Sequence, residues 1–377
     1  MDVEVNTPKI VDTAIIISSR SNPALMELMY SKGFAAHEDY MTLAECRAVT
    51  NGQIEKLLDG NETVTDFREF KYFTGITATG EYFARNAFNL KRIHLPKTLK
   101  HIEGRMFLIT SAQVSAGKRG SLEEVLGVEQ IESVGRTAFQ GQWNLKELNF
   151  TQNLKSIGSA CFTGLLRKVP KTGSIVSFGD LSNVETLETG GSHFEGQKEI
   201  STIYMPKVSV LQPDCFYQCY KLKDITLDWD NITEIPNFAF CFCFSLTNIP
   251  SMDKCTVIGE QCFEHNHSLL TVGDLKEVTI IKSYAFADDP KLTQIGRLDK
   301  CVTIEKQGFA GCNMLDNVYL PVCNSVGEDT FAVYEGQGIK RTITFGLSYE
   351  DISFNAKAFT NNMNTTIICN EVELTAE

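Results

Sequence analysis

Cysteine is the residue type in this chain that most invites a chemical role. The chain has 377 residues and 12 cysteines. Closely spaced thiolates bind zinc, and thiols that meet in the fold form disulfides. Two pairs have suitable spacing, Cys215 with Cys219 and Cys241 with Cys243. Whether these pairs do chemistry depends on the elements that position them.

The histidines and the catalytic motifs give a weaker signal. His265 and His267 flank Asn266, and a polar loop explains this segment better than a metal site. The sequence has no G-x-x-x-x-G-K-S/T phosphate loop, no G-x-S-x-G nucleophile turn and no H-E-x-x-H helix. We therefore expect no catalytic residues, no metal and no cofactor.

Phenylalanine recurs along the chain with a nearly fixed period. Most steps between successive members of the series are 22, 23 or 24 residues long. A period of this length is typical of one supersecondary unit stacked on copies of itself. The series is Phe83, Phe107, Phe139, Phe162, Phe194, Phe216, Phe240, Phe263, Phe286, Phe309, Phe331 and Phe359.

The residues around each Phe form a longer pattern, L-x-x-I-x-L followed by hydrophobic-x-x-I-G-x-x-(A/C)-F. The first part alternates like a short strand with one buried face, and the second indicates a turn that returns the chain. We predict a repeat solenoid of about 11 to 12 coils with short parallel strands on one face. At about 4.8 Å per strand, the array is about 55 Å long.

Nine of the twelve cysteines fall into three columns of this repeat. Other coils place Ala, polar amides or branched aliphatic residues in those columns, so we interpret Cys as a small buried filler. Metal binding or disulfide formation is the alternative. The columns are Cys161, Cys215 and Cys262 just before the Phe, Cys219, Cys243 and Cys312 three after it, and Cys255, Cys301 and Cys323 eight before it.

The recurring pattern resembles the BspA-like leucine-rich repeats that are common in gut and oral anaerobes. Clear copies are NLKELNFTQNLKSIGSACF, KLKDITLDWDNITEIPNFAF and MLDNVYLPVCNSVGEDTF. The resemblance implies a right-handed leucine-rich-repeat coil and a non-enzymatic binding protein, often at a cell surface. Related arrays without signal peptides occur in phage or mobile-element contexts.

The repeat divides the chain into three regions. We predict an N-terminal cap region at residues 1–74, the repeat array at residues 75–360 and a C-terminal cap or tail at residues 361–377. The cap includes a helical segment within Asn22–Val49. In many relatives a calcium loop precedes this helix, but here only Glu45 fits a ligand position, so calcium is not expected.

The repeat spacing changes in two places, and the last coil ends the array. Stretches around Ser111–Gly120 and Thr172–Gly191 are rich in Gly, Ser and Thr, and we predict that both are loops. The terminal segment Thr365–Cys369 offers a strand edge for a second copy of the chain.

The exposed face of the predicted strands is the first place to look for a partner. The third and fifth positions of L-x-x-I-x-L point away from the core. In the irregular coil these positions fall on Lys168 and Pro170. A plain structural role for polar residues on an exposed strand is the alternative. The candidate residues are Arg92, His94, Glu147, Asn149, Tyr204, Asp224, Thr226, Asn248, Gln294, Asn317 and Tyr319.

Composition narrows the class of partner. The net charge of −12 and pI of about 5.1 argue against nucleic acid, because phosphate binding needs basic surface. No apolar run approaches the roughly 18 residues of a membrane helix, and no signal peptide is recognisable. We therefore expect a protein- or glycan-recognition scaffold. The alternative is a structural component of a larger assembly such as a virion or tail, and the location stays open between cell surface, cytoplasm and virion.

Overall fold

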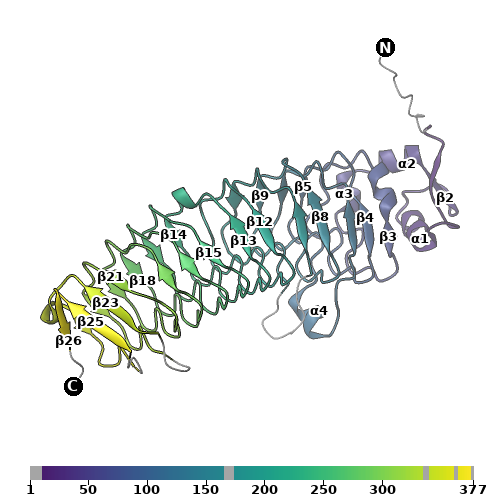
Figure 1. Cartoon of the computed structure of the whole chain (residues 1–377). Coiled ribbons are helices and arrows are strands. Elements are labelled where there is room, and N and C mark those ends of the chain that lie inside the picture. The colour runs from purple at the N-terminus through teal and green to yellow at the C-terminus, as the bar shows by residue number, and fades with distance from the viewer. Residues whose placement is uncertain (1–10, 165–173, 334–338, 361–363, 375–377) are drawn as a thin grey trace, which may run out of the picture.

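The computed structural model describes residues 11–164, 174–333, 339–360 and 364–374. The chain forms a solenoid of about 12 turns, as the repeat predicts. Figure 1 shows the coils stacked along one axis, from a group of helices at the N-terminal end to the strand β26 at the C-terminal end. Among the described residues, no helix has the length and hydrophobicity needed to span a bilayer.

The N-terminal end is closed by short helices and a two-stranded sheet. The strands β1 (Ile15–Ser18) and β2 (Tyr40–Thr42) pair antiparallel around the helix α1 (Pro23–Ser31), which begins with a proline and buries Leu25, Met26 and Met29. This helix confirms the predicted helical segment. The remaining elements are α2 (Leu43–Ala48), α3 (Asn51–Ile54) and the 3-10 helix η1 (Arg68–Tyr72).

The Glu45 side chain caps the N-terminus of α2. Its carboxylate accepts hydrogen bonds from the Ala36 N–H at 2.7 Å, the Thr42 N–H at 2.7 Å and the Thr42 hydroxyl at 2.8 Å. The Thr42 hydroxyl in turn accepts the Glu45 N–H, which completes a capping box. The residue that aligns with a calcium ligand therefore closes the loop by direct hydrogen bonds.

The predicted strands form a first ladder of parallel strands along one face. Their hydrogen bonding is interrupted between β6 and β8, β10 and β12, β13 and β15, and β19 and β21. The strands are β3 (Asp66–Phe67), β4 (Arg92–His94), β6 (Glu124–Leu126), β8 (Glu147–Phe150), β10 (Ser177–Gly179), β12 (Thr202–Tyr204), β13 (Asp224–Thr226), β15 (Asn248–Ile249), β17 (Thr271–Val272), β19 (Gln294–Ile295), β21 (Val318–Leu320), β23 (Arg341–Phe345) and β25 (Thr365–Cys369).

The I-G segment that the sequence indicates as a turn also carries a strand. These two-residue strands form a second ladder, continuous from β5 to β11 and again from β14 to β24. The second residue of each strand is buried, except the half-buried Phe354, and the first is exposed or half-buried. The strands are β5 (His101–Ile102), β7 (Ser133–Val134), β9 (Ser156–Ile157), β11 (Thr186–Leu187), β14 (Glu234–Ile235), β16 (Val257–Ile258), β18 (Ile280–Ile281), β20 (Thr303–Ile304), β22 (Ser325–Val326) and β24 (Ser353–Phe354).

The recurring phenylalanines stack into one column through the core. From Phe107 to Phe359 every successive pair of rings is stacked, with centroids 5.2 to 5.7 Å apart. Ring pairs of this kind add about 0.5–1.5 kcal/mol beyond the burial of their area. The period of the sequence is thus the spacing of a continuous aromatic column.

Each coil turns sharply just before its Phe. The residue two positions earlier has a positive φ in ten consecutive coils although none of the ten is glycine, at a cost of about 1–2 kcal/mol each. The turn lets the chain re-enter the core with the small residue and the Phe in place. The residues are Arg105, Thr137, Ala160, Ser192, Asp214, Phe238, Gln261, Tyr284, Gln307 and Asp329.

The cysteine columns are buried, which confirms their interpretation as packing residues. The structure adds that the thiols three residues after the Phe are also donors. Cys219, Cys243 and Cys312 each place Sγ 3.0 to 3.3 Å from the carbonyl oxygen of the Phe in the preceding coil. In the same column Gln142 and Gln197 donate from their amides to the corresponding carbonyls. The column therefore satisfies a buried main-chain acceptor in five coils.

The two predicted loops differ from each other. The first contains the short helix α4 (Ser111–Ser115), which projects from the solenoid in Figure 1. The second prediction is wrong for residues 174–191, because β10 and β11 lie there and pair with the preceding coil. Residues 172 and 173 of the predicted loop lie outside the described residues.

The C-terminal coil has no open edge on β25. That strand pairs with β23 on one side and, antiparallel, with β26 (Val372–Leu374) on the other. A second copy therefore cannot pair with β25 itself, and a dimer through the C-terminal end near Thr365–Cys369 stays a prediction. The remaining short elements are the 3-10 helices η2 (Trp229–Asn231) and η3 (Tyr349–Asp351).

Candidate functional site

All of the candidate strand-face residues lie on the outer side of the first ladder. His94 is half-buried and the others are exposed. Their positions are Arg92 and His94 on β4, Glu147 and Asn149 on β8, Tyr204 on β12, Asp224 and Thr226 on β13, Asn248 on β15, Gln294 on β19, Asn317 just before β21 and Tyr319 on β21.

The N-terminal part of this face is charged and internally paired. Arg92 lies 3.1 Å from the Asp66 carboxylate, which also accepts Arg68 at 2.8 Å. Such exposed ion pairs contribute little to stability, so both arginines could exchange this partner for a ligand. Burial lowers the pKa of His94, which keeps the imidazole neutral at pH 7.

The amides farther along the face connect neighbouring coils. The Thr271 hydroxyl donates to Asn248 Oδ1 at 2.8 Å, and the Thr342 N–H donates to Asn317 Oδ1 at 2.7 Å. These oxygens therefore support the ladder and are partly used before any ligand binds. The structural role that the sequence left open holds for these two asparagines.

Two tyrosines stand out from this polar surface. Tyr204 and Tyr319 are 54% and 59% exposed, although their main chains are held in parallel pairs opposite Thr226 and Thr344. Five coil steps separate β12 from β21, which is about 24 Å at the spacing of neighbouring strands. One ligand reaching both rings must therefore be a macromolecule or an extended chain.

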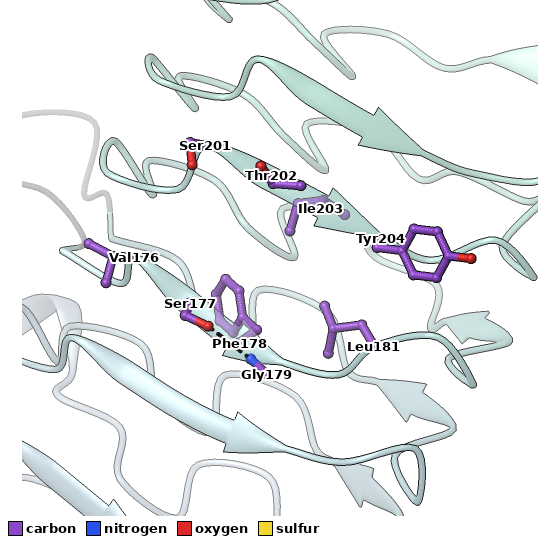
Figure 2. A pocket seen from close by; sticks show the side chains of 9 residues that line it. All are labelled: Val176, Ser177, Phe178, Gly179, Leu181, Ser201, Thr202, Ile203 and Tyr204. Atoms are coloured by element: carbon purple, nitrogen blue, oxygen red, sulfur yellow. Dashed lines mark hydrogen bonds between the residues drawn. The ribbon is translucent and has the colours of Figure 1, made fainter.

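A pocket opens beside Tyr204, where β10 and β12 fail to pair. Its volume is about 230 Å³. Figure 2 shows Phe178 and Ile203 between the two strands, with Tyr204 at the C-terminal end of β12. Among the described residues, none that lines the pocket is an acid, a base or a histidine. The lining residues are Val176, Ser177, Phe178, Gly179, Leu181, Ser201, Thr202, Ile203 and Tyr204.

Sequence reasoning missed this pocket. It assigned the strand-face positions of the coil to Lys168 and Pro170, which lie outside the described residues, whereas the coil's strand is β10 at Ser177–Gly179. The signal that could have found it is the long step from Phe162 to Phe194. A coil of unusual length is where regular strand pairing is most easily interrupted.

The thiols are poor candidates for chemistry. All twelve cysteines are free and buried, and burial raises the pKa of every one, for example to about 12 for Cys46 and Cys215. A nucleophile or metal ligand needs the thiolate, which these surroundings disfavour. Within the described ranges, no group of three or more His, Cys, Asp or Glu side chains is arranged to hold a metal ion.

The repeat decides the family. A family model described as the BspA type leucine rich repeat region matches in 6 copies, over residues 115–180, 171–293 and 279–375. This span is more than half of the chain. The chain belongs to the BspA-type leucine-rich repeat family.

Solved structures of other leucine-rich repeat proteins resemble this BspA-type array. A leucine-rich repeat protein from Bacteroides ovatus is 18% identical, with a TM-score of 0.50 over 81% of this chain and 82% of that one. A leucine rich cell surface protein from Faecalibacterium prausnitzii is 18% identical, with a TM-score of 0.40 over 72% and 83%. The pneumococcal vaccine antigen PcpA is 16% identical, with a TM-score of 0.39 over 75% and 68%.

The first of these likenesses agrees with the fold of the BspA-type array, and at this identity it shows the fold alone. No match is found among curated proteins. BspA-type repeats are generally non-enzymatic scaffolds.

Proposed function

We propose that this BspA-type array is a recognition scaffold that binds a protein or glycan partner through the outer face of its first ladder. The observation that carries the proposal is the exposure of Tyr204 and Tyr319, at 54% and 59%, on strands that are fixed by main-chain pairing. Tyrosine gives a large contact area for little loss of conformational freedom, which is why it is common among residues that dominate binding.

The surroundings of the two rings support the same function. The strands hold both side chains on one face, and the polar residues between them, including Asp224, Asn248 and Gln294, can form the solvated rim of an interface. The pocket beside Tyr204 adds a concave feature to an otherwise regular surface. An extended surface of this kind suits a large partner better than a small metabolite.

Site-specific photo-crosslinking tests the proposal. A benzoylphenylalanine residue replaces Tyr204 or Tyr319 in the full chain, and the protein is irradiated with intact cells and with culture fluid of the source organism. The same probe at Thr256 and Thr279, which are exposed beside the second ladder, is the matched control. We expect one set of crosslinked partners, identified by mass spectrometry, from the first-ladder positions only.

The pattern of crosslinks separates the alternatives. Equal yields from both ladders, or none from Tyr204 and Tyr319, would contradict recognition by the first ladder. Crosslinks to structural subunits of one particle, on several faces at once, would instead favour the role of an assembly component. The double variant Tyr204→Ala with Tyr319→Ala should reduce capture of an identified partner at least tenfold, which corresponds to about 1.4 kcal/mol.

A further inference from the structure

The strand β10 presents one unpaired edge to the pocket. On its other side, the Val176 N–H donates to the Lys146 carbonyl at 2.8 Å and the Asp180 N–H donates to the Phe150 carbonyl at 2.8 Å. Main-chain groups of a strand alternate between its two neighbours. The main chains of Ser177 and Gly179 are therefore directed toward β12.

The strand β12 presents a second edge from the opposite side. The Lys223 N–H donates to the Ser201 carbonyl at 2.9 Å, and the Met205 N–H donates to the Thr226 carbonyl at 2.9 Å. These contacts face β13. By the same alternation, the N–H and C=O groups of Thr202 and Tyr204 are directed toward β10.

No main-chain hydrogen bond joins β10 to β12 in the described part of the chain. The Gly179 N–H is occupied locally by the Ser177 hydroxyl at 3.2 Å, as Figure 2 shows. Gly179 also explains why β10 lies close to β8, because a Cβ at this position would be 2.3 Å from the Phe150 carbonyl oxygen. The space therefore lies on the β12 side of β10.

The chemistry of the space matches a peptide main chain. It runs along two parallel strands of three residues each, a length of about 10 Å. Its floor is apolar, from Phe178, Leu181 and Ile203, and no charged side chain among the described residues lines it. An added strand between β10 and β12 could form main-chain hydrogen bonds with the N–H and C=O groups of both strands.

We propose that the slot between β10 and β12 binds one extended peptide segment of about three residues with uncharged side chains. The bound segment adds a strand and joins the β8–β10 pair to the β12–β13 pair, closing one of the four interruptions of the first ladder. This inference rests on the proposed recognition function, and it specifies the chemistry of the partner at one place on the face.

Amide hydrogen exchange of the full chain, resolved to single residues, is the first measurement. Without a ligand, the amides of Thr202 and Tyr204 should exchange at least about tenfold faster than the amide of Ile203, which faces β13 on the same strand. Equal slow exchange at the three residues would show that the edge is already paired and would overturn the inference.

A capped peptide of alternating Thr and Val is the probe for the second measurement. At millimolar concentration it should slow exchange at Thr202 and Tyr204 at least tenfold in a saturable way. The same peptide with N-methyl groups on alternate residues should have no effect, because it cannot form one row of hydrogen bonds. The inference would be rejected if the unmodified peptide gave no protection, or if the N-methylated peptide protected equally well. Protection by N-acetylglucosamine would show instead that the slot binds sugars.

A pair of variants tests the location. Val176→Lys places a charge at the rim of the slot and should weaken peptide binding at least tenfold, whereas Val302→Lys, at a similarly exposed valine beside the second ladder, should leave it unchanged. Equal effects of the two variants would contradict binding in the slot. Crosslinking at Tyr319 reports the recognition function separately, so a negative peptide result with a positive Tyr319 crosslink rejects the slot alone.

Discussion

His193 offers a sharp test of how the core of the solenoid responds to pH. It occupies the column just before the Phe, where most other coils have Ala or Cys, and its side chain is fully buried. Burial lowers the pKa of this imidazole from 6.5 to about 4. The folded chain therefore excludes the protonated form that the unfolded chain adopts at mildly acidic pH.

The size of the effect follows from that shift. The contribution of His193 to stability is fully present above pH 6.5 and is lost as the pH falls from 6.5 to about 4. Each unit of pKa difference corresponds to about 1.4 kcal/mol, so the free energy of unfolding should fall by about 3 kcal/mol over this window through His193 alone. The variant His193→Ala, which restores the usual residue of the column, should lack this loss.

Urea denaturation at a series of pH values across this window measures the difference. The free energy of unfolding of the parent chain and of His193→Ala is compared at each pH, so that protonation of carboxylates common to both cancels. The variant His101→Ala removes an exposed histidine and is the control. If the parent and His193→Ala lose the same stability between pH 6.5 and 4, the buried imidazole does not couple folding to protons and the reasoning is wrong.

Two further predictions concern the core. Phe286 is fully buried between two stacked rings at 5.2 Å, so Phe286→Ala should lower the free energy of unfolding by about 3–5 kcal/mol. Phe359 is half-buried and has one neighbour in the column, so Phe359→Ala should lower it by about half as much. Equal losses of the two variants in urea denaturation would contradict a continuous column. Burial raises the pKa of Asp289 well above its usual value, so stability should fall by up to about 1.4 kcal/mol per pH unit as the pH rises from about 4 to the folded-state pKa. Asp289→Asn, which keeps an acceptor for the Asn266 N–H, should abolish that slope, and an unchanged slope in pH-dependent denaturation would assign it to other groups.

The regular part of the fold was predictable because its determinants repeat. The spacing of the Phe residues gave the coil, and the columns of Cys219 and Cys312 indicated buried packing. The donor role of these thiols was not visible, since it depends on the position of a carbonyl in the preceding coil. The second ladder was missed because strands of two residues are too short to show the alternation by which a strand is recognised in a sequence.

Of the candidate site, the exposed tyrosines could be predicted from the sequence and the pocket could not. The exposure of Tyr204 and Tyr319 follows from strand alternation, which sequence reasoning can apply. The pocket depends on the separation of β10 from β12, which do not pair with each other. Such a distance between coils has no local signature, and the long step after Phe162 indicated only that the coil was irregular.

The middle of the array is built so that one coil can replace another. Between residues 233 and 300, hydrogen bonds repeatedly join residues 23 positions apart, as in the Thr256 and Thr279 hydroxyls that donate to the carbonyls of Thr233 and Thr256. A duplication or deletion of one whole coil in the gene would therefore leave every remaining neighbour contact in register. Recombination between repeat-coding segments could lengthen or shorten the face that meets a partner in single-coil steps while the cap and the slot beside Tyr204 stay intact.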